Sequence, residues 1–196
     1  METPPSTPDR IPVNIITGFL GSGKTSAVLN LLKQKPPKEQ WAILVNEFGE
    51  IGVDQSLMQG HSVTHHDVAI LEVPGGCMCC AAGLPMQMAL SQLLFLGTPD
   101  RLLIEPTGLG HPVEVLQTLY SEAYRESLEV QSTVTLIDAR SAAKERHANH
   151  ASFVQQLWIA DVILANKKDL YSSHELALIE DLVQQHCDRD IAIYPT

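Results

Sequence analysis

The segment 18–25, GFLGSGKT, constrains the fold of this chain more than any other. It follows an apolar run at 13–17 and opens a helical pattern at 24–33, so it matches G-x-x-x-x-G-K-[ST] between a strand and a helix. Such glycines let backbone N–H groups converge on phosphate oxygens, while Lys24 neutralises phosphate charge and Thr25 offers its hydroxyl to Mg²⁺. The segment therefore predicts a phosphate-binding loop. We expect the nucleotide to contact Gly18, Gly21, Ser22, Gly23, Lys24, Thr25 and Ser26.

Short apolar runs alternate with longer helical patterns along the rest of the chain, which is typical of a doubly wound, mostly parallel α/β sheet. Runs rich in Ile, Leu and Val predict strands at 13–17, 41–46, 69–73, 101–105, 133–138, 161–165 and 191–194. Helices are predicted at 24–33, 85–96, 112–122, 152–159 and 174–186. Residues 49–66 fit neither periodicity and contain three glycines, so we expect a mobile loop there.

The composition limits the class of protein. A chain of 196 residues with 44% hydrophobic content suits one α/β domain, expected over 11–196 after a disordered leader at 1–10. Thirteen basic residues against 23 acidic ones give a net charge of -10, which disfavours nucleic acid as a partner. No stretch is apolar enough to span a membrane, and four cysteines clustered three to one do not suggest a disulfide framework. We therefore expect a cytoplasmic protein.

A second nucleotide motif, NKKD, occupies residues 166–169 directly after an apolar run. A carboxylate at Asp169 can accept both N–H donors on one edge of guanine, whereas adenine presents an acceptor there. Sites built on such hydrogen bonds discriminate by about 10⁴-fold. The motif favours GTP over ATP, with Asn166, Lys167 and Asp169 as binding residues; a merely charged loop after a strand is the alternative.

Acidic residues follow two of the predicted strands, at the edge where parallel sheets bind ligands. Glu105 ends the run 101–105 and is placed to contact the Mg²⁺ shell through a water, with capping of the next turn as the alternative role. Gly108 would let the following loop approach the γ-phosphate closely. Glu47 and Glu50 could face the metal, the attacking water or the γ-phosphate, and Glu47 is our leading candidate for orienting the water.

Three cysteines, Cys77, Cys79 and Cys80, fall within four residues just after a double glycine. Neighbouring residues of a strand point to opposite faces, so three thiolates converge only from a turn, which the glycines permit. Thiolates bind borderline cations such as Zn²⁺, which takes four tetrahedral ligands. We expect a Zn²⁺ site with Glu50 as the leading fourth ligand. The alternatives for that position are His61, His65, His66, His111 and water.

Other interpretations of these cysteines remain open. They are a redox pair between Cys77 and Cys80, a disulfide between the adjacent Cys79 and Cys80, and inert buried thiols. The metal site is favoured because three cysteines after a double glycine are a poor way to fill a core. Cys187, alone near the end of the last predicted helix, is expected to be a core residue.

Together these segments resemble the CobW-type family of zinc-binding P-loop GTPases and, within it, the bacterial YeiR-like branch. The resemblance covers nearly the whole chain. It rests on GFLGSGKT from Gly18, NEFGE from Asn46, CMCC from Cys77, IEPTGLGHP from Ile104 and NKKD from Asn166. It implies a P-loop fold of the SIMIBI type, in which the cysteines hold a transition metal, most often Zn²⁺.

The resemblance also implies a function, that of a metallochaperone. GTP hydrolysis would be coupled to holding or delivering the metal to a client protein, and copies of the chain would associate in a metal- or nucleotide-dependent way. Glu50 occupies the position of a family acid implicated in metal binding, whereas Val45 stands where some relatives carry a second acid. Because the family continues into a smaller C-terminal domain, we expect this chain to be a truncated form.

Hydrolysis is expected to be slow, because no arginine stands out as a group that would stabilise the transferring phosphate. Two rival functions remain: a zinc buffer or sensor in which hydrolysis is vestigial, and a small-molecule kinase that shares the phosphate-binding loop. The NKKD motif argues against the kinase, since it favours guanine.

Overall fold

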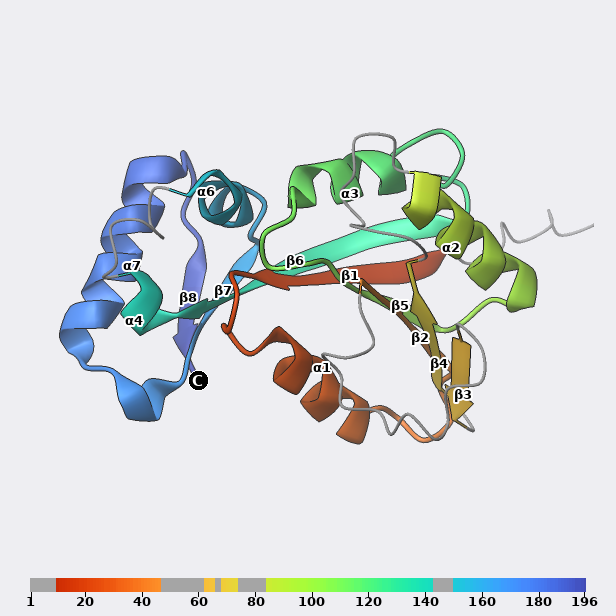
Figure 1. Ribbon diagram of the computed structural model, residues 1–196, viewed down its shortest axis with the longest axis horizontal. Helices are drawn as coiled ribbons and strands as arrows, with labels where there is room; N and C mark the ends of the chain where they lie inside the picture. The colour runs from red at the N-terminus through yellow and green to blue at the C-terminus, as the bar shows by residue number, and fades with distance from the viewer. Residues whose placement is uncertain (1–9, 47–61, 66–67, 74–83, 143–149) are drawn as a thin grey trace, which may run out of the picture.

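The computed structural model describes residues 10–46, 62–65, 68–73, 84–142 and 150–196, with the backbone alone at 62–65 and at Ala142. This part of the chain forms an eight-stranded sheet in the order β3-β4-β2-β5-β1-β6-β7-β8 (Figure 1). The strands are β1 (Ile11–Gly18), β2 (Trp41–Val45), β3 (Ser62–His65), β4 (Val68–Glu72), β5 (Arg101–Glu105), β6 (Leu128–Asp138), β7 (Val162–Asn166) and β8 (Ala192–Pro195). The helices are α1 (Lys24–Lys33), α2 (Leu84–Leu96), α3 (Pro112–Leu119), α4 (Ala139–Ala142), α6 (Ala151–Trp158) and α7 (Ser173–His186), with a 3-10 turn η3 (Lys168–Leu170).

Every pairing in this sheet is parallel except that of the edge strand β3, which runs antiparallel to β4. Parallel strands that are buried on both faces need helices on both sides. Accordingly, α2 and α3 pack on one face of the sheet and α1 packs on the other. The predicted doubly wound, mostly parallel sheet is confirmed.

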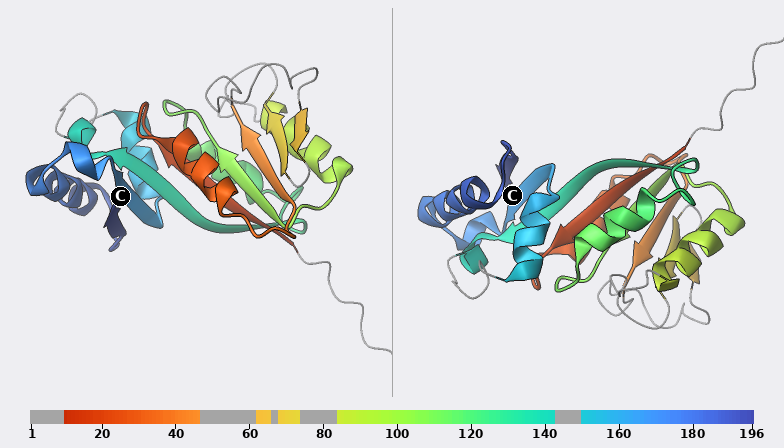
Figure 2. Two further views of the ribbon diagram at one scale, coloured as in Figure 1. Left: turned by 90° about the horizontal axis from the view of Figure 1, so that it is seen from below. Right: turned by 90° about the horizontal axis from the view of Figure 1, so that it is seen from above.

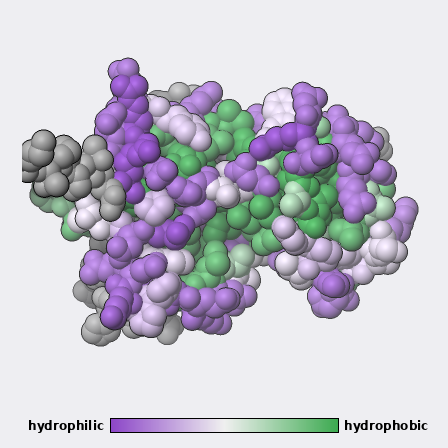
Figure 3. Space-filling view, turned by 180° about the vertical axis from the view of Figure 1, so that it is seen from behind, coloured by the Kyte–Doolittle hydropathy of each residue, from purple (hydrophilic) through white to green (hydrophobic). Residues whose placement is uncertain are grey.

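A third apolar cluster joins α6 and α7 to the ends of β6 and β7, and it includes Phe19 from the loop after β1. Figure 2 shows the sheet twisting along its length, so that the β7–β8 end is rotated relative to the β3–β4 end. The face in Figure 3 is largely polar, with apolar patches between the polar side chains. None of the described helices is long and apolar enough to cross a membrane.

The strand order brings four loops to one edge of the sheet. β1 lies between β5 and β6, and β7 follows β6, all parallel. The carboxyl ends of these strands therefore meet at one edge, where the chain leaves the sheet at Gly18, Glu105, Asp138 and Asn166. Because α1 carries the chain from β1 past β5 to β2 while β6 lies on the other side, β1 is the topological switch point at which doubly wound sheets bind ligands.

The short helix α4 was not predicted and β1 begins at Ile11 rather than at residue 13, but the larger differences from the sequence-based expectation lie in three other segments. The prediction of an irregular loop was wrong for residues 62–65, which form β3, a short polar strand that the apolar runs did not reveal; residues 49–61 and 66 lie outside the described part. β6 begins at Leu128 rather than at residue 133, because its first half alternates with exposed positions. α3 ends at Leu119 rather than at 122, where turns carry the chain on to β6.

Shortening a buried side chain at the centre of the sheet should destabilise the fold strongly. Leu44 of β2 is fully buried in the core cluster that the sheet forms with α2 and α3. We expect Leu44→Ala to lower the free energy of unfolding by about 3 kcal/mol, because it removes buried methyl groups and leaves a cavity. Urea denaturation measures the change. Leu31→Ala on α1, where the leucine is 40% exposed, is the matched control and should cost less than half as much; equal losses would contradict the packing described.

Candidate functional site

The loop after β1 is shaped by glycines. Gly18, Gly21 and Gly23 have φ values of 148°, 72° and 98°, in the region that favours glycine. A Cβ at Gly18 would lie 2.2 Å from the carbonyl oxygen of Leu136, and one at Gly23 would lie 2.4 Å from Asn166 Nδ2. The glycine spacing of the motif therefore serves both the turn itself and its close contact with β6 and β7.

Helix α1 begins at Lys24, directly at this loop, and places three polar residues in its first turn. The Lys24 side chain is only 5% exposed, Thr25 is half-buried and Ser26 is exposed. Thr25 Oγ1 donates a hydrogen bond of 2.9 Å to Glu105 Oε1, and Glu105 is only 4% exposed at the end of β5. A buried cation, a hydroxyl and a buried carboxylate thus meet at the N-terminus of a helix, where the backbone dipole favours anions.

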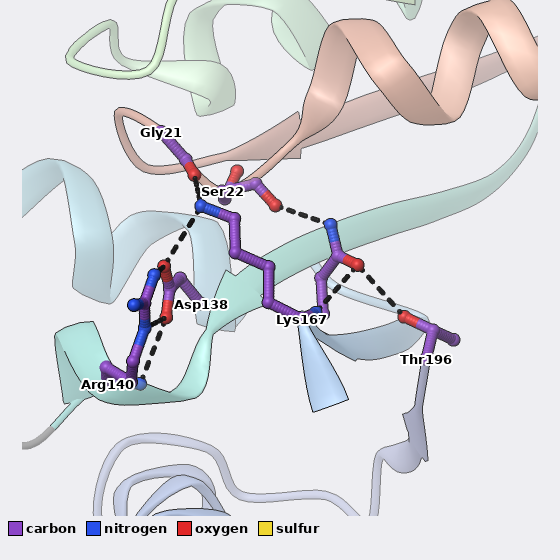
Figure 4. Close-up of polar contacts among 7 residues, drawn as sticks. Gly21, Ser22, Asp138, Arg140, Lys167 and Thr196 are labelled. Atoms are coloured by element: carbon purple, nitrogen blue, oxygen red, sulfur yellow. Dashed lines mark hydrogen bonds and ion pairs between the residues drawn. The ribbon is translucent and has the colours of Figure 1, made fainter. Parts of the chain in front are cut away.

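The end of β7 holds the glycine-rich loop from the other side (Figure 4). Asn166 Nδ2 donates to the carbonyl oxygen of Ser22 at 2.8 Å, and Lys167 Nζ donates to that of Gly21 at 2.6 Å. Asn166 Oδ1 in turn accepts a bond from the backbone N–H of Lys167 at 2.8 Å. Lys167 adopts a left-handed backbone conformation, with φ 66°, which turns its side chain toward the loop. The two predicted nucleotide motifs are therefore in direct contact.

A carboxylate at the end of β6 anchors Lys167. Asp138 Oδ2 lies 3.1 Å from Lys167 Nζ, and Arg140 binds the same carboxylate through Nε and Nη2 at 3.0 and 2.7 Å. The hydrogen-bonded Arg140 guanidinium, together with Lys167, lowers the pKa of Asp138 from 3.8 to about 2 against the opposing effect of burial. Asp138 therefore remains ionised across the physiological range and keeps Lys167 in place.

Asp169 lies in the η3 turn that follows, and its side chain is exposed at the same edge. The pKa of Arg140 is raised chiefly by Asp138 and to a smaller extent by the charge of Asp169. The backbone of the turn is held by a bond from Lys168 N to Thr196 O at 2.9 Å, and Tyr171 Oη donates to Ala165 O at 2.6 Å. Asp169 thus sits on a fixed turn just after Asn166 and Lys167, the two residues that contact the glycine-rich loop.

The structure does not place the other predicted site residues, apart from His111, at this site. Glu47, Glu50, Cys77, Cys79 and Cys80 lie outside the described residues, as do His61 and His66, and the side chain of His65 is not described. Within the described part of the chain, no group of three His, Cys, Asp or Glu side chains could hold a metal ion. His111 Nδ1 lies 3.3 Å from Gln155 Oε1. Cys187 is half-buried against the α6–α7 cluster, and burial raises the pKa of its thiol.

Several residues of the site were missed by sequence reasoning. Asp138 ends a predicted strand at the ligand edge, so the rule that singled out Glu105 could have found it. Arg140 follows two residues later but has no motif of its own. Gln156 and Ser152 of α6, which bind backbone carbonyl oxygens of the loop after β5, carry no sequence signal at all, because any backbone carbonyl accepts a hydrogen bond.

Two proteins that are similar in sequence to this chain carry the name zinc chaperone. It is 50% identical over 156 residues to the zinc chaperone YeiR of Escherichia coli, covering 80% of this chain and 46% of that protein. It is 31% identical over 214 residues to the zinc chaperone CobW of Sinorhizobium sp, covering 96% and 60%. The chain thus spans about half the length of the curated relatives that it matches.

Solved structures share the fold. The Zn(II)-bound YjiA GTPase of E. coli superposes with a TM-score of 0.65 at 26% identity, over 89% of this chain and 54% of that one. The cell division protein FtsY of Thermotoga maritima does so with a TM-score of 0.55 at 15% identity, over 95% and 61%, which shows the fold alone. These matches confirm the predicted P-loop fold of the SIMIBI type.

The family follows from a match that covers almost the entire described domain. Residues 12–193 match the family model described as CobW/HypB/UreG, nucleotide-binding domain. This range includes the glycine-rich loop, Glu105, and the Asn166–Lys167 contacts with that loop. The chain therefore belongs to the CobW/HypB/UreG family, of which it carries the nucleotide-binding domain.

Proposed function

We propose that this chain binds and slowly hydrolyses GTP and couples the nucleotide state to holding or delivering Zn²⁺ to a client protein. The observation that carries the proposal is the convergence of two strand ends on the segment 18–25: Glu105 at the end of β5 contacts Thr25, and Asn166 and Lys167 at the end of β7 contact Ser22 and Gly21. The names of the relatives, zinc chaperones and a Zn(II)-bound GTPase, support the metal as cargo.

In this proposal the phosphates lie on the loop at 18–25 and the base lies beside β7. Lys24 neutralises the β- and γ-phosphates, and Gly18, Gly21, Ser22, Gly23, Thr25 and Ser26 surround them. Asn166 and Lys167 brace the loop, and the exposed carboxylate of Asp169 accepts the N–H donors of guanine. Glu47 orients the attacking water. Hydrolysis is slow because no arginine is assigned to the transferring phosphate.

The residues at the start of α1 suit Mg²⁺ as a cofactor. A hydroxyl and a carboxylate only 2.9 Å apart, Thr25 Oγ1 and Glu105 Oε1, form the oxygen donor set that this ion prefers. Thr25 would hold the ion directly and Glu105 would hold it through water. When bound, Mg²⁺ supplies positive charge that stabilises the phosphates of the nucleotide.

The zinc site would be formed by Cys77, Cys79 and Cys80, with Glu50 as the fourth ligand. The described ends of two strands support this pairing, because β2 and β4 are adjacent and parallel, with Val45 opposite Glu72. Val73 N also donates to Val45 O at 2.9 Å. The segments that carry Glu50 and the cysteines therefore leave the sheet from neighbouring positions, so that a loop ordered by the γ-phosphate would alter the metal site.

Selectivity for guanine should depend on Asp169. We expect Asp169→Asn to weaken GDP binding at least about 100-fold, because charge-assisted hydrogen bonds to the base are lost, and to leave ADP binding unchanged. Titration calorimetry with both nucleotides measures this. Asp181→Asn, at an exposed position on α7, is the matched control. Equal affinity of the unaltered chain for ADP and GDP would rule out the guanine assignment.

Zinc affinity should depend on the nucleotide. We expect Zn²⁺ to bind at least about fivefold differently with GDP and with a non-hydrolysable GTP analogue, because linkage between two sites runs in both directions. Competition with a chromogenic chelator measures it. Cys79→Ser should abolish the difference by removing a ligand, whereas Cys187→Ser should preserve it. Identical zinc affinities in the two nucleotide states would refute the coupling.

The ion pairs that Asp138 forms with Lys167 and Arg140 should make the free energy of unfolding depend on pH. The pKa of Asp138 is lowered on folding from 3.8 to about 2, so its ionised form stabilises the fold above pH 4 by roughly 2 kcal/mol. That contribution disappears as the pH falls from about 4 to about 2. We expect Asp138→Asn to be less stable than the unaltered chain at pH 7, with a difference that shrinks below pH 4. Urea denaturation across this range measures it, and a difference that does not vary with pH would contradict the assignment.

A further inference from the structure

We propose that Gln156 of α6 is a positioning residue for the nucleotide: it holds the loop at 106–111, after β5, in the place where that loop meets the γ-phosphate. The inference rests on the proposed function, since it needs a guanine nucleotide on the glycine-rich loop. It goes further by assigning a role to a buried helix residue outside the nucleotide motifs.

One face of α6 binds the loop after β5 at three successive points. Gln156 Nε2 donates to Gly108 O at 3.0 Å, and Ser152 Oγ donates to Leu109 O at 2.8 Å. Gln155 Oε1 lies 3.3 Å from His111 Nδ1. Residues 152, 155 and 156 are spaced i, i+3 and i+4, so they share one side of the helix. The loop is therefore fixed along most of its length by a single helix.

The other side of the same loop rests on the glycine-rich loop. A Cβ at Gly108 would lie 2.8 Å from the backbone nitrogen of Leu20, so the two backbones are in contact with no room for a side chain. α6 also touches the glycine-rich loop directly, because the ring of Phe19 packs edge-on against His150 and Phe153 at centroid distances of 5.3 and 6.1 Å. Gly108 is thus clamped between the phosphate-binding backbone and Gln156.

Because Gln156 is buried, its polar amide has a cost that its hydrogen bond to Gly108 must offset. Gln156 and Ser152 are each only 1% exposed. Within the described residues, Gln156 Oε1 is buried without a hydrogen-bond partner, which is a cost that an apolar side chain of similar size would avoid. Among the described residues, its Nε2 donates to the carbonyl oxygen of Gly108, which lies three residues after Glu105.

In this proposal the γ-phosphate is the only part of the nucleotide that the loop after β5 contacts, so the loop makes no contact with GDP. Loosening it should therefore weaken binding of a GTP analogue and leave GDP binding unchanged. A role confined to packing would instead lower stability and affect both nucleotides alike. The ratio of the affinity for the GTP analogue to the affinity for GDP therefore distinguishes a positioning role from a packing role.

The test uses Gln156→Met, which keeps the length of the side chain and removes the donor. We expect the affinity for a non-hydrolysable GTP analogue with Mg²⁺ to fall about tenfold, with GDP affinity within about twofold of the unaltered chain. Ser152→Ala removes the neighbouring bond to Leu109 O and should shift the ratio in the same direction, and it decides the question if Gln156→Met does not fold.

Thr135→Val is the matched control. Thr135 Oγ1 donates to the backbone carbonyl oxygen of Gln156 at 2.9 Å, so this variant removes a buried hydrogen bond of the same residue without touching the loop. It should lower the melting temperature and leave the affinity ratio unchanged. An unchanged ratio in Gln156→Met and Ser152→Ala, or an equal shift in Thr135→Val, would overturn the inference. Failure of the unaltered chain to bind either guanine nucleotide would instead overturn the proposed function.

Discussion

The carbonyl oxygens of the glycine-rich loop are held by side chains, and the site depends on this. Asn166 binds Ser22 O and Lys167 binds Gly21 O. Because the C=O and N–H of a trans peptide point in opposite directions, fixing Ser22 O toward β7 turns the N–H of Gly23 the other way, away from β7. The positive φ of Gly23 and its contact with Asn166 allow the two segments to approach this closely. The loop is thus preorganised by β7 before any ligand binds.

Helix α6 unites the parts of the site that are distant in sequence. Its first turn contacts Phe19 of the glycine-rich loop and the loop after β5, and its far end leads directly into β7. The buried Thr135 and Gln156 fasten it to β6 through a hydrogen bond. The contacts of this helix therefore link the phosphate side of the site to the strands β6 and β7.

Much of the fold was predictable, because buried parallel strands are apolar runs and the helices between them carry clear start and stop signals. α1 and β5 have the predicted bounds, and the motifs located Thr25, Glu105 and Asn166 at the ligand edge. Polar strands escaped this reasoning: β3 and the first half of β6 gain their order from pairing with neighbours. Contacts made to backbone, such as those of Gln156, were also invisible, because the acceptor is independent of residue type.

The strand order limits how the two ends of this edge can communicate. From β4 to β7 it runs β4-β2-β5-β1-β6-β7, so the chain leaves β4 on one side of the glycine-rich loop and the NKKD motif leaves β7 on the other. Five strand spacings of about 4.8 Å separate them by roughly 24 Å, farther than any side chain reaches. In the proposed function, the base would therefore select the nucleotide at the β7 end, and only the number of its phosphates could influence the segment that follows β4.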